Sequence, residues 1–270
     1  MLAGAEPFHY DVGSRTGALL IHGFTATPQA LRELAARLRT AGFSSEAPLL
    51  PGHGTDVRDL NRTTWEQIER TAEQALQDLA TRVSKLVIVG ESSGGSVALR
   101  LAARYPDLVD GVVTVGGSLL FPQDWLVRKI APLFRWINPA MRKVHRADVK
   151  DRSSLDTRVA YTHLPMHAFT RMLAYNTAAR TDCPRVRAPL LVLQALHDHA
   201  VPIESANLIC DSTSSTYKKV IWYPESYHVI LIDLEKEQAF RDIVDFVRQV
   251  DAGTLPGGKV RPTCSASCSW

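Results

Sequence analysis

The sequence predicts one α/β domain built on a mainly parallel sheet. The first observation is a set of short, almost continuously apolar segments, which are typical of strands buried on both faces of a sheet. They cover residues 18–21, 86–89, 112–115, 190–193 and 220–223, with a weaker candidate near 43–47. The second observation is that amphipathic helical patterns lie between these segments. This alternation predicts repeated strand–helix units, with helices on both faces of the sheet.

Three helices are predicted from apolar residues at helical spacing, with charged residues on the opposite side. They lie within residues 31–38, 65–83 and 240–247. Thr27 before Pro28 and the pair Thr63–Thr64 are typical helix starts, because hydroxyl groups cap free N–H groups and proline fits the first helical position.

The chain of 270 residues is divided into a core, an insertion and a tail. Residues 119–180 show no clear strand, which predicts a small helical cap between core segments 1–118 and 181–251. Residues 252–270 are rich in Gly, Pro, Ser and Cys, which predicts a flexible C-terminal tail. Cys264 and Cys268 in this tail lack further metal ligands nearby, so no metal site is expected.

Composition and charge exclude several classes of protein. Hydrophobic residues make up 45% and charged residues 22%, which excludes a disordered or fibrous chain. The net charge of +3 is too small to indicate a nucleic acid partner or an anionic membrane. No apolar run reaches about 18 residues, so stable membrane insertion is not expected. The N-terminus shows no secretory signal pattern, so we expect a cytoplasmic location.

The strongest functional signal is the segment Gly90–Glu91–Ser92–Ser93–Gly94, between a predicted strand and a helical pattern. It matches the G-x-S-x-G pattern of a nucleophile elbow, which presents a serine on a sharp turn. Glycine is needed on both sides, because larger side chains would clash with the neighbouring backbone. We therefore predict that Ser92 is a nucleophile, the alternative being a tight turn with a serine in solvent.

Two later segments supply groups that activate a serine. Asp198 follows the predicted strand 190–193, and His228 lies between the last predicted strand and the final helix. The chain order Ser92, Asp198, His228 is the order of nucleophile, acid and base in α/β-hydrolases. In that arrangement the imidazole takes the serine proton and the carboxylate orients the imidazole. The alternative role for Asp198 is to cap the helix that begins near Pro202.

An acyl-transfer site also needs two N–H donors for the developing oxyanion. Ser93 follows the nucleophile, and Phe24 lies in the segment His22–Gly23–Phe24 directly after a predicted strand. We predict that the backbone N–H groups of Phe24 and Ser93 form the oxyanion hole. His22 and His53 are interpreted as residues that shape loops.

Longer segments make the chain resemble an α/β-hydrolase of the bacterial carboxylesterase and monoacylglycerol lipase type. They are LIHGFTATPQALRELAARL, APLLPGHG, VIVGESSGGSVAL, PLLVLQALHDHAVPIESAN and WYPESYHVILIDLEKE. The resemblance implies an α/β-hydrolase fold and a serine carboxylesterase that needs no cofactor. It implies hydrolysis of short- to medium-chain esters or monoacylglycerols. By position it implies Ser92 as nucleophile, His228 as base and Asp198 as orienting acid, with Phe24 and Ser93 as oxyanion donors.

Two positions depart from the family pattern. Tyr227 stands where many relatives have glycine before the catalytic histidine, so its phenol is expected to narrow the cleft, contact substrate or simply pack. Glu91 stands beside the nucleophile, where uncharged residues are also common. A buried carboxylate there would need a partner, unless it forms a local hydrogen bond away from the chemistry.

The insertion is predicted to cover the cleft and line an acyl pocket, the alternative being that its apolar residues pack on the core. The candidate substrate-binding residues are Trp125, Leu126, Ile130, Phe134 and Tyr227. The same two interpretations apply to Met166, Phe169, Met172 and Leu173. Exposed aromatic residues in the insertion would be unfavourable in a monomer, which leaves a homodimer open.

Other functions remain open on the same scaffold. Thioesterases, amidases, carbon–carbon hydrolases and perhydrolases share this fold, because fold does not determine function. A dehalogenase is disfavoured, since it would need a carboxylate at position 92. A ligand receptor without turnover is the alternative outside enzymes. The favoured partner is a small-molecule ester, and no nucleic acid partner is expected.

Overall fold

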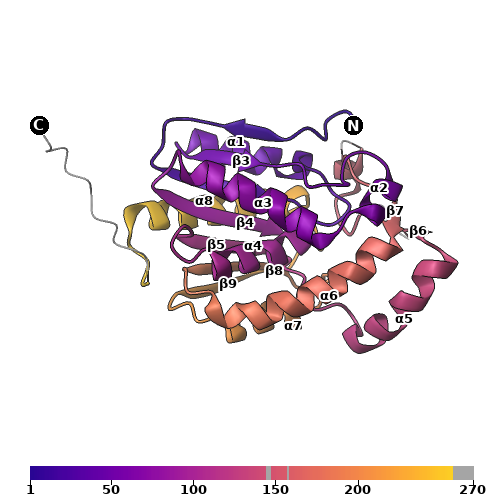
Figure 1. Cartoon of the computed structure of the whole chain (residues 1–270). Coiled ribbons are helices and arrows are strands. Elements are labelled where there is room, and N and C mark those ends of the chain that lie inside the picture. Colours follow the sequence, from indigo (N-terminus) through magenta and orange to yellow (C-terminus); the bar gives the residue numbers. More distant parts are fainter. Residues whose placement is uncertain (144–146, 157, 258–270) are drawn as a thin grey trace, which may run out of the picture.

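The computed structural model describes residues 1–143, 147–156 and 158–257 (Figure 1). Its central sheet has the strand order β1-β3-β2-β4-β5-β8-β9. Only β1 is antiparallel to its neighbour, so the predicted mainly parallel sheet is confirmed. The strands are β1 (Phe8–Tyr10), β2 (Thr16–Ile21), β3 (Ser44–Ala47), β4 (Lys85–Glu91), β5 (Gly111–Val115), β8 (Leu190–Ala195) and β9 (Lys218–Tyr223).

Helices cover both faces of the sheet, and a cap lies at one end of the molecule (Figure 1). The core helices are α1 (Arg32–Thr40), α2 (Val57–Arg62), α3 (Trp65–Ala80), α4 (Ser93–Arg104), α7 (Ile203–Ser212) and α8 (Lys236–Ala252). The cap contains α5 (Asp124–Ile137), β6 (Ala140–Arg142), β7 (His163–Pro165) and α6 (Met166–Asp182). Short 3₁₀ helices are η1 (Pro28–Leu31), η2 (Arg152–Leu155), η3 (Cys183–Arg185) and η4 (Ile230–Ile232).

The central strands are buried on both faces, which explains their continuous apolar sequences. In β4, Val87 and Val89 pack in one cluster with residues of α1 and α8. Leu86 and Ile88 pack in a second cluster with residues of α3, α4 and α7. Because successive strand residues point to opposite faces, both sets must be apolar.

The insertion contains strands as well as helices. The expectation that residues 119–180 hold no strand was wrong, because β6 and β7 pair antiparallel there. Each has only three residues, which is too short to show an alternating pattern.

The described chain continues past the last helix. Gly253 ends α8 in a left-handed conformation with φ of 70°, and Leu255 is buried against the core. Residues 258–270, with Cys264 and Cys268, lie outside the described residues. Over the described part of the chain, no helix combines the length and apolar character needed to cross a membrane.

Thr64→Ala tests whether the predicted start of α3 stabilises the fold. Thr64 Oγ1 accepts a hydrogen bond from the Gln67 N–H, and Gln67 Oε1 accepts one from the Thr64 N–H. Losing this cap should lower the free energy of unfolding by about 1 kcal/mol, measured by urea denaturation. Thr71→Ala, in the middle of the same helix, is the control and should leave stability unchanged or slightly higher. Equal effects at the two positions would contradict this role for the cap.

Candidate active site

Ser92 sits at the apex of a sharp turn between β4 and α4. Its backbone is strained, with φ of 52° and ψ of −118°. A Cβ atom on Gly90 would lie 2.3 Å from the Gly94 carbonyl oxygen, and one on Gly94 would lie 2.3 Å from the Ile21 carbonyl oxygen. Both positions therefore require glycine, which is the physical reason for the G-x-S-x-G spacing.

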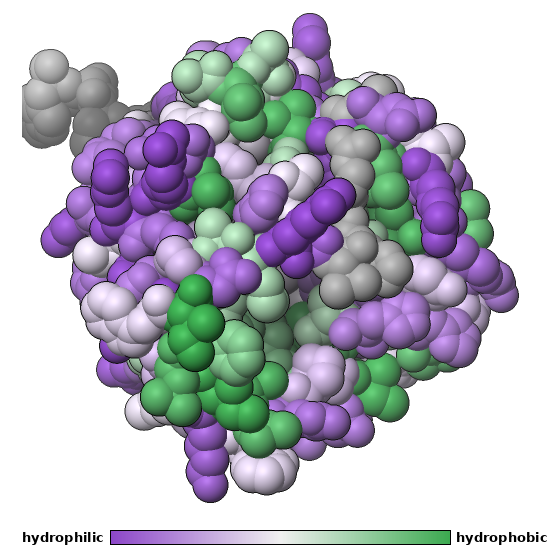
Figure 2. Space-filling model, turned by 90° about the vertical axis from the view of Figure 1, so that its right-hand side faces the viewer, coloured by the Kyte–Doolittle hydropathy of each residue, from purple (hydrophilic) through white to green (hydrophobic). Residues whose placement is uncertain are grey.

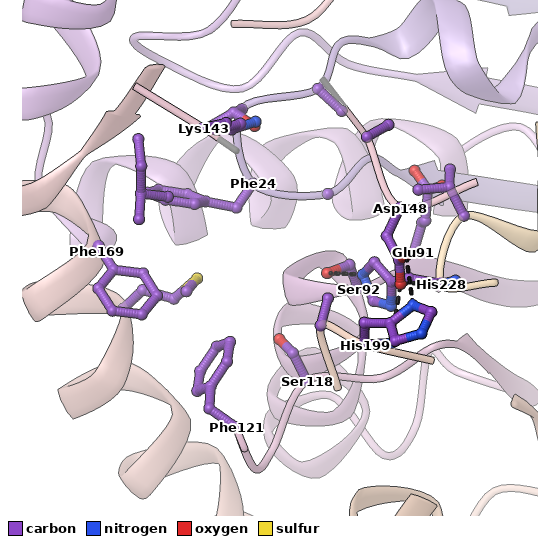
Figure 3. Close-up of a pocket in the computed structure, with 18 of the residues that line it drawn as sticks. Phe24, Glu91, Ser92, Ser118, Phe121, Lys143, Asp148, Phe169, His199 and His228 are labelled. Carbon is purple, nitrogen blue, oxygen red and sulfur yellow. Dashed lines mark hydrogen bonds and ion pairs between the residues drawn. The ribbon is translucent and has the colours of Figure 1, made fainter. Parts of the chain in front are cut away.

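The structure brings Ser92, His228 and Asp198 into one hydrogen-bonded chain (Figure 3). His228 Nε2 lies 2.9 Å from Ser92 Oγ, and His228 Nδ1 lies 2.7 Å from Asp198 Oδ2. The carboxylate can only accept, so Nδ1 carries the proton and leaves Nε2 free to accept the serine hydroxyl. This is the tautomer that a general base acting on serine requires.

Asp198 both orients the imidazole and organises its own loop. Its side chain is fully buried. Oδ1 accepts the N–H groups of Ala200 and Val201, at 2.9 and 2.7 Å. Oδ2 accepts the Gln194 amide at 2.9 Å as well as His228. The alternative that Asp198 caps the helix near Pro202 was wrong, because α7 begins without a side-chain cap and Asp198 Oδ1 instead holds the loop before this helix.

The environment of His228 favours its protonated form. Burial of the ring is the largest single effect and opposes the imidazolium, whereas the charge and the hydrogen bond of the Asp198 carboxylate favour it. Glu91 and Asp148 add to the effect, and together they raise the pKa of His228 above its usual 6.5. The site therefore stabilises the charge that the base acquires when it takes a proton.

Asp148, from the cap, joins the two loops that carry the acid and the base. Its Oδ2 accepts the backbone N–H groups of His199 at 2.9 Å and of His228 at 3.3 Å. Its Oδ1 lies 2.8 Å from His199 Nδ1. The Asp148 carbonyl accepts the Val229 N–H at 3.1 Å. This role was missed in the sequence analysis, because residues 142–158 look like a polar surface loop.

His22 and His53 shape the loops beside the nucleophile. The His22 ring is buried, and its Nε2 accepts the Leu50 N–H while Nδ1 lies 3.1 Å from the Gly23 carbonyl. Burial holds the pKa of His22 well below its usual range, and the charge of His53 adds to this effect. Burial also lowers the pKa of His53 to about 4. Both rings are therefore neutral near pH 7, and within the described part of the chain neither forms a hydrogen bond with Ser92.

The loop with Phe24 lies against the nucleophile. A Cβ atom on Gly23 would be only 3.1 Å from Ser92 Cβ, so the backbone of this loop passes directly beside the serine. Ser93 is the first residue of α4, where an N–H group has no intrahelical carbonyl to bind. The structure thus places both predicted oxyanion donors next to Ser92.

Ser92 and His228 open into a cavity of about 370 Å³ between the core and the cap. Part of the wall is apolar, formed by Phe121, Leu164, Phe169 and Met172. The rest carries charged or polar side chains, namely Glu91, Lys143, Asp148, Arg158 and His199. Both carboxylate oxygens of Glu91 are buried without a hydrogen-bond partner among the described residues, so the alternative of a local hydrogen bond was wrong.

The cap residues expected to bind substrate lie elsewhere. Trp125, Leu126, Ile130 and Phe134 do not line the cavity. Trp125 is 66% exposed and Phe134 is 45% exposed, and Figure 2 shows hydrophobic residues gathered on the surface at this end of the molecule.

The reason is that α5 has two apolar sides. It packs on α6 through Val127 and the small Ala131, which turns its aromatic residues outward. Phe169 and Met172 of α6 line the cavity instead, whereas Met166 and Leu173 pack between α6 and α5.

Tyr227 also lies outside the cavity lining. Its ring packs edge-on against His199, with the ring centres 4.7 Å apart. Its N–H donates to Asp233 Oδ2 at 2.7 Å. In the described part of the chain, no group of His, Cys, Asp or Glu residues is arranged to hold a metal ion.

The pH profile tests the electrostatics of His228. Activity needs the neutral imidazole, so kcat/KM should fall as pH drops through its raised pKa, with an acid limb above pH 6.5. Asp198→Asn removes the carboxylate charge but leaves the His228 ring buried. The pKa of His228 should therefore fall, and the acid limb should move to lower pH. The same change should reduce kcat by about 10⁴-fold. Asp211→Asn, at an exposed position of α7, is the control. An acid limb that stays in place in Asp198→Asn would contradict this account.

Asp148→Asn tests the link between the cap and the catalytic loops. An amide group cannot accept all the N–H donors that surround the carboxylate, so His228 should lose its position. We expect kcat on a soluble ester to fall about 10-fold while KM changes little. The acid limb should also shift to lower pH, because Asp148 helps to raise the pKa of His228. Asp156→Asn removes an exposed carboxylate from the same segment and is the control. A change in KM alone would contradict a positioning role.

Comparisons with known proteins agree with this geometry. A family model described as serine aminopeptidase, S33 matches residues 14–235. The chain is 30% identical over 247 residues to the thermostable monoacylglycerol lipase of Bacillus sp. (strain H-257), covering 91% of this chain and 95% of that protein. It is 25% identical over 248 residues to the carboxylesterase of Bacillus subtilis (strain 168), covering 91% and 97%.

A solved structure reported with the metagenome-derived lipolytic enzymes LipS and LipT has a TM-score of 0.85 to this chain. The two chains are 29% identical, with 92% of this chain and 99% of the other covered. The resemblance inferred from sequence motifs is therefore confirmed, and because the family match spans well over half of the chain, this protein belongs to the serine aminopeptidase S33 family of α/β-hydrolases.

Proposed function

We propose that this protein is a serine carboxylesterase that hydrolyses short- to medium-chain esters or monoacylglycerols. The observation that carries the proposal is the chain of hydrogen bonds from Ser92 through His228 to Asp198, which opens into the cavity. The monoacylglycerol lipase and the carboxylesterase among its relatives support an ester as the substrate. The cavity volume of about 370 Å³ suits a small ligand.

The geometry supports a two-step reaction. Ser92 Oγ attacks the ester carbonyl carbon as its proton passes to His228 Nε2. The N–H groups of Phe24 and Ser93 stabilise the negative oxygen of the tetrahedral intermediate. His228 then gives its proton to the leaving alcohol oxygen as the C–O bond breaks. Water attacks the acyl-enzyme in the second step, with His228 again acting as base, and the acid is released.

The proposal is tested by hydrolysis rates on p-nitrophenyl esters from acetate to palmitate, with Ser92→Ala measured in parallel. We expect a maximum at short or medium acyl chains, and a loss of kcat by at least about 10⁴-fold in Ser92→Ala. Circular dichroism and the melting temperature verify that the variant is folded.

Other outcomes would lead to different conclusions. A maximum at the longest chains would indicate a lipase. Turnover of p-nitroanilides or thioesters without ester turnover would indicate another hydrolase reaction on this fold. A large ligand-induced rise in melting temperature with no turnover of any substrate would indicate a receptor. The cytoplasmic location and the homodimer stay predictions from the sequence.

A further inference from the structure

Two cationic side chains of the cap, Lys143 and Arg158, line the same cavity as Ser92. Lys143 follows β6, and Arg158 lies between η2 and β7. Within the described residues, neither cation has a carboxylate within ion-pair distance. Both are therefore available to a molecule that occupies the cavity.

The donor groups of these cations are largely unused. Lys143 Nζ donates to Thr25 Oγ1, in the loop that also carries Phe24. The Nε and Nη1 atoms of Arg158 are buried without a hydrogen-bond partner among the described residues. An unpaired guanidinium N–H group away from water is unfavourable, so a ligand that accepts these hydrogen bonds would be bound strongly.

The carboxylates on the cavity wall form no ion pair with Lys143 or Arg158 among the described residues. Asp148 is already engaged with His199 and with the N–H of His228. Glu91 favours the charged form of Arg158 through space but forms no ion pair with it. Burial, and then the charge of Arg158, lower the pKa of Lys143 to about 7. An anion bound beside the ammonium group would oppose both effects and favour its charged form.

The remaining wall of the cavity indicates what the other part of the ligand is. Phe121, Leu164, Phe169 and Met172 form an apolar surface in the same cavity. In the view of Figure 3, Lys143 and Phe121 lie on different sides of Ser92. The cavity therefore has an apolar part and a cationic part around one nucleophile, which fits an ester with one apolar arm and one anionic arm.

We propose that the preferred substrates are esters that carry a negatively charged group, a carboxylate or a phosphate, and that Lys143 and Arg158 bind this group. The inference rests on the proposed function, because it names the substrate class of the Ser92 site. It also assigns specificity to two residues that take no part in the transfer of protons.

The test compares esters in matched pairs that differ in one anionic group. The first pair is p-nitrophenyl pentanoate and mono-p-nitrophenyl glutarate, with a carboxylate on the acyl side. The second is ethyl butyrate and the butyrate ester of glycolate, with a carboxylate on the alcohol side. The third is monobutyrin and 1-butyrylglycerol 3-phosphate, with a phosphate on the alcohol side. We expect the anionic member of at least one pair to have a kcat/KM about 10-fold to 100-fold higher than its partner.

Lys143→Met, Arg158→Met and the double variant assign the effect to the two cations. Methionine keeps an unbranched apolar stem and removes the charge. The ratio of kcat/KM for the anionic ester to kcat/KM for its neutral partner should fall to about 1 in the double variant. Arg142→Met removes an exposed cation next to Lys143 in sequence, and it is the matched control that should behave like the wild type.

A competition measurement on the wild type does not depend on the folding of any variant. Glutarate and inorganic phosphate are added to the hydrolysis of p-nitrophenyl butyrate, with acetamide as the neutral comparison. We expect competitive inhibition by at least one anion, weakening as salt screens the charges.

The outcomes separate this inference from the proposed function. Two results would overturn the inference and leave the esterase assignment intact. One is Ser92-dependent hydrolysis of neutral esters with no preference for any anionic ester. The other is a preference for anionic esters that survives in the double variant. Failure to hydrolyse every ester, neutral or charged, would overturn both.

Discussion

The close approach of the turn after β4 to the carboxyl end of β2 is the constraint on which the rest of the site depends. Gly94 packs against the carbonyl of Ile21, and Gly23 passes beside Ser92 Cβ. These contacts leave no space for side chains, so the serine is forced into a strained backbone conformation at the apex. The same contacts bring the loop that carries Phe24, the proposed oxyanion donor, beside Ser92. The packing of the neighbouring parallel strands β2 and β4 thus places both Ser92 and the loop with Phe24.

The acid and the base come from the other half of the sheet, and the cap helps to hold them. Asp148 bridges the loops of His199 and His228, and Asp233 provides a second connection. Asp233 is buried and accepts N–H groups from Lys150 and Asp151 of the cap, and from Tyr227 beside the catalytic base. The cap is therefore part of the scaffold that orients the imidazole, besides being a wall of the cavity.

Charge is distributed unevenly around this nucleophile. Buried carboxylates raise the pKa of His228, whereas Lys143 and Arg158 on the same cavity wall form no ion pair within the described residues. In a cavity with little water these charges act more strongly than they would at the surface. Under our proposals, the apolar wall and the charges together select the substrate, and the Ser92, His228 and Asp198 chain performs the chemistry.

The sequence by itself determined the fold class, the strands and the order of nucleophile, acid and base. A strand buried on both faces requires consecutive apolar residues, and the turn at Ser92 requires glycine at fixed positions. Both features are therefore visible as local patterns in the sequence. Tertiary structure decided which residues surround the substrate. A helix with two apolar sides does not reveal which side faces the core, so Trp125 and Phe134 point outward while Phe169 of α6 lines the cavity. Polar loop residues look alike in sequence whether they meet solvent or a cavity, so the roles of Asp148, Lys143 and Arg158 emerge only when the cap folds over Ser92.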